Sequence, residues 1–388
     1  MRKILIPLLM ALCLVSLNVL SVQGQETGIV LKSQEVHNQF PEGIEFEVIA
    51  ETTPEAQIQE IKLEFKLVGS QRSSYTYLEF TPAVQVDGKY LLHTDGAQYK
   101  PPGMLIEYRF VITDSGGCAE ETEKQTFLYL DSRFQWEKIT DGLVEVYYYG
   151  PMQSRAESVL KASTDTIASM GTLLGVAPTR AIRVLGYNSP TEMAAALPFQ
   201  AEAIATHLIT EGQAWYDYGV LLELIGSFEA EGTASHELTH MLVREVFGGA
   251  FVNVPIWLNE GLAEYSNANS AFANDPRLSA AAATNQLLPI RHMQSLPGKP
   301  QDILLAYAES RSIVTYLIDT YGGEKLRGLL ATLKQGAQID DALKKVYGFD
   351  QDGLDNAWRE SLNFPLLAEQ PAAPSSRWQF GCASRTAQ

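Results

Sequence analysis

The sequence has few basic residues, few cysteines and almost no long apolar runs. Lysine and arginine together number 29 against 46 aspartates and glutamates, which gives a formal net charge of −17 at pH 7. A surface of this sign repels nucleic acid and anionic lipid, so we expect neither as a partner. The one apolar run that approaches membrane-spanning length, residues 4–20, lies directly behind Met1-Arg2-Lys3.

That apolar run and the small residues after it are typical of a secretory signal peptide. Val22 and Gly24 stand at the two positions that a signal peptidase reads before its cut. We therefore predict that residues 1–24 are removed and that the protein is exported. An uncleaved N-terminal anchor is the alternative. The chain has no Asn-x-Ser/Thr sequon and no sorting signal, so periplasm, cell surface and medium all stay open.

Cysteine is too rare to build a disulfide framework. The chain has three cysteines, and Cys13 lies inside the N-terminal apolar run. Cys118 and Cys382 would remain in the exported protein. In an oxidising compartment they can pair, and each can equally stay free.

Residues 25–133 show the two-residue periodicity of an all-β domain. Ile44–Val48 and Ile61–Leu67 alternate apolar and charged side chains, as half-buried strands do. Asp87-Gly88 is predicted to form a hairpin turn. Six or seven short strands over about a hundred residues predict a β-sandwich that resembles immunoglobulin and fibronectin type III modules. Nothing in this stretch indicates what the domain binds.

Residues 134–365 combine predicted strands with predicted helices, most of the helices lying in the second half. Three apolar runs are expected to be strands, and a long amphipathic stretch between the first two is expected to be a helix. The strands are Leu143–Tyr147, Ala181–Tyr187 and Val220–Leu224, and the helix is Ser154–Leu174. The last segment, residues 366–388, is rich in Ala, Pro and Ser and is expected to be a tail.

The segment Thr233–Arg244 contains the pattern His-Glu-x-x-His, formed by His236, Glu237 and His240. On a helix, residues four apart lie about one turn apart on one face, so both imidazoles can reach one metal ion. Glu237 follows the first histidine and can contact a water on that metal without being a ligand. The pattern therefore predicts a metal-dependent hydrolytic site.

A second predicted helix, which begins near Pro255, supplies carboxylates. Glu260 and Glu264 are four residues apart and share a face. Two histidines and one carboxylate leave a fourth tetrahedral position for water, which is the arrangement of a catalytic zinc. We expect Glu260 to be the third ligand. Glu264 is expected to accept the free ring N–H of a ligand histidine and thereby to fix its tautomer.

These two motifs resemble the gluzincin metallopeptidases, the clan of thermolysin and the zinc aminopeptidases. Nineteen residues separate His240 from Glu260, as in thermolysin-like enzymes. The sequence Asn259-Glu-Gly-Leu-Ala-Glu264, by contrast, is more similar to that of the aminopeptidases. The resemblance implies a Zn²⁺ peptidase of α+β fold that acts on peptide or protein substrates. It implies that Glu237 is the general base. It also implies that Tyr307 stabilises the transition state, with a packing tyrosine as the alternative.

The resemblance also bears on how substrate is held. Val220–Leu224 corresponds to the strand that forms the edge of the gluzincin cleft and pairs with extended substrate, with a buried strand as the alternative. The Gly-x-Met-Glu-Asn segment by which aminopeptidases hold a free α-amine is absent, and its place is nearest Tyr216–Val220. Its absence favours cleavage inside extended chains.

Two other functions stay open. The chain can be a secreted binding or adhesion protein whose β-sandwich carries the function and whose peptidase fold is vestigial. It can also hold zinc for structure alone. The intact general base Glu237 argues against a vestigial site, which has no reason to keep it.

Overall fold

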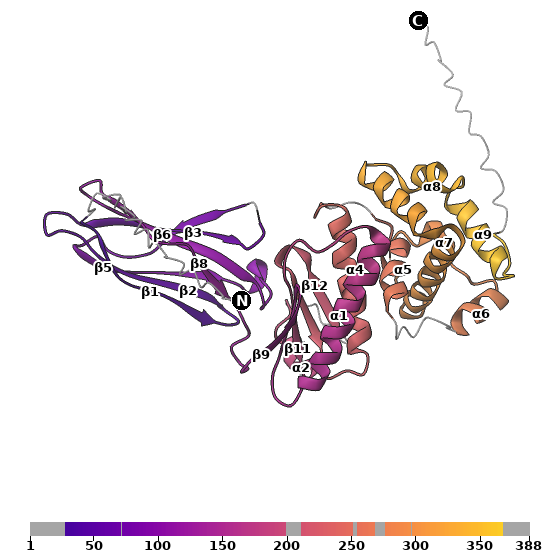
Figure 1. The fold of residues 1–388 in the computed structure, drawn as a ribbon, viewed down its shortest axis with the longest axis horizontal. Coiled ribbons are helices and arrows are strands. Elements are labelled where there is room, and N and C mark those ends of the chain that lie inside the picture. Colours follow the sequence, from indigo (N-terminus) through magenta and orange to yellow (C-terminus); the bar gives the residue numbers. More distant parts are fainter. Residues whose placement is uncertain are drawn as a thin grey trace, which may run out of the picture.

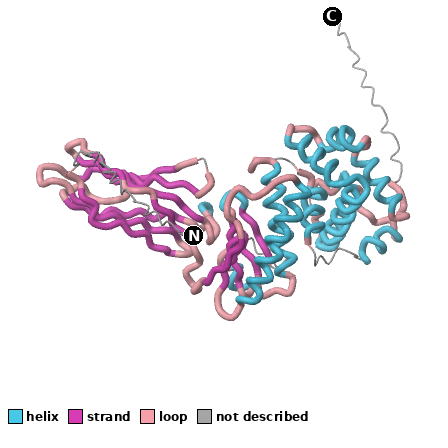
Figure 2. Tube along the Cα trace, in the orientation of Figure 1, coloured by secondary structure: helices cyan, strands magenta, loops and turns pink. Residues whose placement is uncertain are grey.

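The computed structural model describes residues 28–70, 72–198, 211–250, 254–267, 276–295 and 297–367. An all-β domain is followed by a mixed domain whose second half is helical (Figures 1 and 2), as the sequence predicts. The expected signal peptide, Cys382 and the tail after residue 367 lie outside the described residues. Within them, no helix combines the length and apolar character needed to cross a membrane.

The β domain packs two sheets face to face. Phe46 and Val48 of one sheet and Leu63 and Phe110 of the other are fully buried between them. One sheet has the order β1-β2-β5, and the other has the order β4-β3-β6-β7 with β8 also paired to β6. The strands are β1 (Val30–Gln39), β2 (Gly43–Glu51), β3 (Ile58–Leu67), β4 (Ser74–Tyr77), β5 (Gln85–His93), β6 (Leu105–Asp114), β7 (Ala119–Glu121) and β8 (Gln125–Leu128).

The hairpin turn predicted at Asp87-Gly88 is wrong, because both residues lie inside β5. They pair with Ile49 and Val48 of β2 in an unbroken antiparallel register. Gly88 packs tightly against the opposite sheet there. A Cβ at this position would lie 3.2 Å from the side chain of Ile61 in the opposite sheet.

The mixed domain begins with a five-stranded sheet of order β12-β13-β11-β10-β9. Its three central strands are parallel, and the two outer strands run antiparallel to them. Two helices, α1 (Gln153–Leu174) and α4 (Ala230–Val246), cover one face (Figure 1). The strands are β9 (Glu137–Asp141), β10 (Val144–Tyr148), β11 (Ile182–Tyr187), β12 (Gly212–Trp215) and β13 (Val220–Leu224), and the short helix α2 (Pro190–Ala194) follows β11.

The expectation that Val220–Leu224 forms the cleft edge is wrong. This strand, β13, lies between β11 and β12, and all five of its residues are buried. The buried-strand alternative is therefore correct. In the described part of the chain the outer strand on this side is β12, whose four residues are half-buried.

The helical half packs around a separate apolar core that contains Trp257, Leu258 and Val314. Helices α5 and α7 approach very closely at Gly261, where a Cβ would lie 2.4 Å from the backbone oxygen of Ser310. Gly322, with φ of 78°, interrupts α7. The helices are α5 (Ile256–Ser266), α6 (Pro276–Ala283), α7 (Pro300–Lys334), α8 (Ile339–Tyr347) and α9 (Gln351–Ser361).

The two domains touch through loops of the β domain. Gly103, with φ of 97°, lies against the five-stranded sheet, and a Cβ there would come within 2.6 Å of Leu185 Cδ1. The hydroxyl of Tyr99 donates a hydrogen bond to the backbone oxygen of Ala196 at 2.8 Å. Contacts this close hold the two domains at a defined distance from each other.

A buried carboxyl in α7 makes stability depend on pH. Burial raises the pKa of Glu309 from near 4.5 to about 8. One oxygen accepts the N–H of Leu288 at 2.9 Å, and no described residue partners the other. The folded state thus binds a proton more tightly than the unfolded chain does, and the stabilisation present at low pH is lost as pH rises through about 8.

Replacing this carboxyl with an amide tests that dependence. Glu309→Gln should melt about 3 °C or more above wild type at pH 9, since one kcal/mol corresponds to roughly 2–4 °C in a domain of this size. The difference should shrink steadily towards pH 5, where the wild-type carboxyl is protonated. Calorimetry of both proteins between about pH 5 and pH 9 measures this difference in melting temperature. A difference that is constant with pH would contradict the raised pKa of Glu309.

Candidate metal centre

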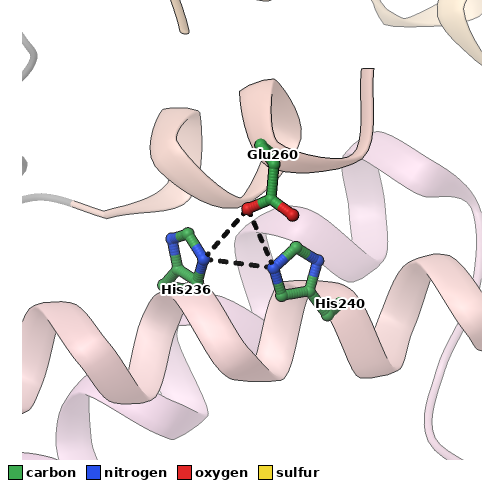
Figure 3. A group of neighbouring side chains, drawn as sticks. All are labelled: His236, His240 and Glu260. Atoms are coloured by element: carbon green, nitrogen blue, oxygen red, sulfur yellow. Dashed lines mark hydrogen bonds and ion pairs between the residues drawn. The ribbon is translucent and has the colours of Figure 1, made fainter. Parts of the chain in front are cut away.

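Helices α4 and α5 bring three ligand-type side chains to one point (Figure 3). His236 and His240 project from adjacent turns of α4, and Glu260 reaches them from α5. The two Nε2 atoms are 3.1 Å apart, and Glu260 Oε2 lies 3.5 and 3.4 Å from those of His236 and His240. The spacing of the motifs predicts this grouping of His236, His240 and Glu260.

The three donors fit a zinc ion. Bonds of about 2.0–2.1 Å in a tetrahedron place the ligand atoms about 3.3–3.4 Å apart, close to the separations observed. The electrostatics also favour a cation. Burial by itself lowers the pKa of His236, but the carboxylates of Glu260 and Glu264 outweigh burial and raise it to about 10. The surrounding negative charge therefore favours a positive charge at this point.

Glu264 lies behind His236 and not among the three converging donors. Its Oε1 is 2.9 Å from His236 Nδ1, and its side chain is nearly buried. Arg311 of α7 donates to the backbone oxygen of Glu264 at 2.7 Å, which ties the end of α5 to α7. The contact between the Glu264 carboxylate and His236 places a proton on Nδ1 of His236 and leaves its Nε2 free to bind a metal.

Glu237, next to His236 in the chain, lies close to strand β12 of the sheet. Gly212 of β12 faces it so closely that a Cβ there would lie 3.0 Å from Glu237 Cγ and 2.5 Å from Thr233. Nothing in the sequence indicated that Gly212 lies at this site, because only the pairing of β12 with β13 brings it to α4. The general-base candidate is thus half-buried beside the edge strand of the sheet.

Tyr307, which the resemblance alone suggested, lies at the same site. Its ring centroid is 6.4 Å from that of His236. Burial is the main cause that raises its pKa, and the carboxylates of Glu260 and Glu264 add to it. The phenol therefore stays protonated at neutral pH and can donate a hydrogen bond.

The sequence reading also missed Glu223, a carboxyl inside the buried strand β13. It is fully buried, and neither of its oxygens has a partner among the described residues. Burial raises its pKa well above the ordinary value, and the nearby carboxylates of Glu231 and Glu237 act in the same direction. The only feature of the sequence that could have indicated this buried carboxyl is the single acidic residue in the apolar run Val220–Leu224.

A His-His-Glu centre on two helices beside a mixed sheet defines a metallopeptidase type of fold and site. Residues 162–364 match the family model of the Peptidase MA superfamily, and the chain belongs to that superfamily. The predicted relation to the gluzincins is thereby confirmed. The comparison with curated proteins gives no match.

Two solved structures are similar over most of the chain. One is a mutant M1 zinc metallopeptidase from Deinococcus radiodurans, 12% identical, with 88% of this chain and 97% of that chain covered and a TM-score of 0.35. The other is a two-domain M1 zinc metallopeptidase mutant bound to L-arginine, also 12% identical, with 85% and 94% covered and a TM-score of 0.38.

Proposed function

We propose that this protein is a zinc-dependent peptidase that cleaves inside extended chains. One observation carries the proposal. His236, His240 and Glu260 present their ligand atoms at the spacing of a tetrahedral zinc site, while Glu237, next to His236 in the chain, lies close to the edge strand β12. A structural zinc site has no use for a carboxylate in this position.

Zinc bound by these three residues would activate a water and polarise the scissile carbonyl. Glu237 accepts the proton of the attacking water on its carboxylate and passes it to the leaving amine. Tyr307 donates its hydroxyl hydrogen to the developing oxyanion. Glu264 keeps the ring of His236 in the orientation that hydrolysis requires.

The sheet supports the choice of an extended substrate. Within the described residues no strand pairs with the outer edge of β12, so its backbone groups can pair with a peptide. The absence of the Gly-x-Met-Glu-Asn segment supports an endopeptidase over an aminopeptidase. The N-terminal apolar run supports action outside the cytoplasm.

Metal analysis and casein hydrolysis, each with and without chelator, separate the proposed function from its two rivals. One bound zinc together with chelator-sensitive cleavage is the expected result. Bound zinc without any cleavage would instead favour a structural zinc. A protein with neither zinc nor activity would favour a binding or adhesion role for the β domain.

Tyr307→Phe should lower kcat on the order of 10²–10³-fold with little change in KM, as the loss of one oxyanion donor does. The phenylalanine ring keeps the packing, so the melting temperature should stay near that of wild type. A packing tyrosine predicts the reverse pattern, in which Phe is neutral and Ala loses several kcal/mol of stability through a cavity. A Phe variant within about threefold of the wild-type rate would remove Tyr307 from the mechanism.

A further inference from the structure

A cavity of about 980 Å³ lies between the β domain and the mixed domain. The charged side chains that line it are mostly basic, whereas in the molecule as a whole acidic residues far outnumber basic ones. Five side chains on its walls are cationic, and one is acidic. The cations are Lys66, Arg72 and Lys100 from the β domain and Arg180 and Arg244 from the mixed domain, and the acid is Asp217.

The wall from the mixed domain is held in place by one aromatic ring. The guanidinium carbons of Arg180 and Arg244 lie 4.5 and 5.3 Å from the ring centroid of Tyr216. The hydroxyl of Tyr216 donates to Glu245 at 2.5 Å, and Arg180 Nη1 donates to the backbone oxygen of Asp217 at 2.9 Å. The two positive charges are therefore positioned before any ligand arrives.

The wall from the β domain adds three more cations. Lys100 Nζ donates to the backbone oxygens of His93 and Gln98 at 3.0 and 2.9 Å, which leaves one N–H for a ligand. Lys66 lies 3.4 Å from Glu107 and remains about one-third exposed. Arg72 is exposed on the loop after β3. Neither domain alone forms this set of charges.

Helix α4 runs from the metal centre to the cavity, which its residue Arg244 lines. His236, His240 and Arg244 follow one another at intervals of four residues, so they share one face and rise about 6 Å per step. Strand β12 follows the same path, from Gly212 beside Glu237 to the end next to Tyr216. An extended chain on β12 advances about 3.3 Å per residue, so the cavity begins roughly four residues from Glu237.

We propose that this cavity, together with the outer edge of β12, binds an acidic segment of the peptide substrate about four residues from the scissile bond. The inference rests on the proposed function and adds a substrate class to it. Phe65, Leu67 and Ile106 also line the cavity, so a segment that alternates carboxylates with aliphatic side chains fits it best. The net charge of the molecule disfavours a long polyanion such as nucleic acid.

Binding can be measured without cleavage in the full chain carrying Glu237→Gln. The probes are two short fluorescein-labelled peptides, one with the centre Glu-Leu-Glu-Leu and one with Gln-Leu-Gln-Leu. Fluorescence anisotropy should give at least about tenfold tighter binding of the glutamate peptide, since partly exposed ion pairs each contribute up to about fivefold. The preference should shrink as salt is raised, because exposed charges are screened.

The paired variant Lys66→Gln with Arg72→Gln should reduce the preference to about twofold or less. A matched control, Lys32→Gln with Lys89→Gln, removes the same charge from ion pairs with Glu51 and Glu47 outside the cavity and should keep the preference. Equal binding of the two peptides, or an unchanged preference in the paired variant, would overturn the inference. Because this readout needs no hydrolysis, a protein that binds selectively but never cleaves refutes only the proposed function.

Discussion

Glu237→Gln is expected to abolish hydrolysis of casein while leaving the metal site and the fold in place. General-base catalysis contributes about 10²–10⁴-fold, and the amide can hold the attacking water without accepting its proton. Its side chain has the same size, so the close contact with Gly212 of β12 is kept. Initial rates of wild type and variant at equal zinc content measure the effect.

The control for that experiment must remove one carboxylate elsewhere. Glu157→Gln on α1 makes the same change away from the metal centre, where Glu157 contacts only Gln153 among the hydrogen bonds described. It should cleave casein at the wild-type rate. If Glu237→Gln does so as well, the proposed general base is wrong, whatever the metal content.

The second large effect is expected at the metal. Glu260→Ala removes one of the three converging donors and should weaken zinc binding by more than 100-fold. Glu264→Ala removes only the partner of His236 Nδ1 and should cost about 10–100-fold. Competition with a chromophoric chelator gives both affinities on one scale.

The fold must be checked alongside these affinities, because Glu260 and Glu264 both lie on the packed helix α5. Circular dichroism and melting of the metal-free proteins serve this purpose. Glu260→Gln, which keeps the side-chain volume, should still lose most of the affinity. Stoichiometric zinc retained by Glu260→Ala, or equal losses at Glu260 and Glu264, would end the assignment of ligands.

Local periodicity was enough to predict which side chains share a face on each helix of the metal centre. Residues four apart on a helix share a face whatever the rest of the chain does, so His236 and His240 had to point the same way. The same rule applied to Glu260 and Glu264. The order of a β-sandwich followed by an α+β domain was also readable, since alternation of period two and amphipathic helices are local patterns.

Sequence periodicity could not decide which residues face each other across the tertiary structure. Asp87-Gly88 is a common turn sequence, yet Ile61 in the opposite sheet makes Gly88 a packing position within a strand. The strand Val220–Leu224 is apolar because both faces of the sheet are covered, and only the sheet order shows that β12 lies outside it.

The cationic cavity depends on the same long-range arrangement. Lys66 and Arg244 are far apart in the sequence and belong to different domains. In the sequence, each of these two residues is indistinguishable from an ordinary surface charge. The sequence by itself determined which side chains share a face on each of the two helices, because residues within one or two helical turns are neighbours whatever the tertiary structure is. Only the tertiary structure decided where substrate can lie, because that surface forms where two domains and a sheet edge meet.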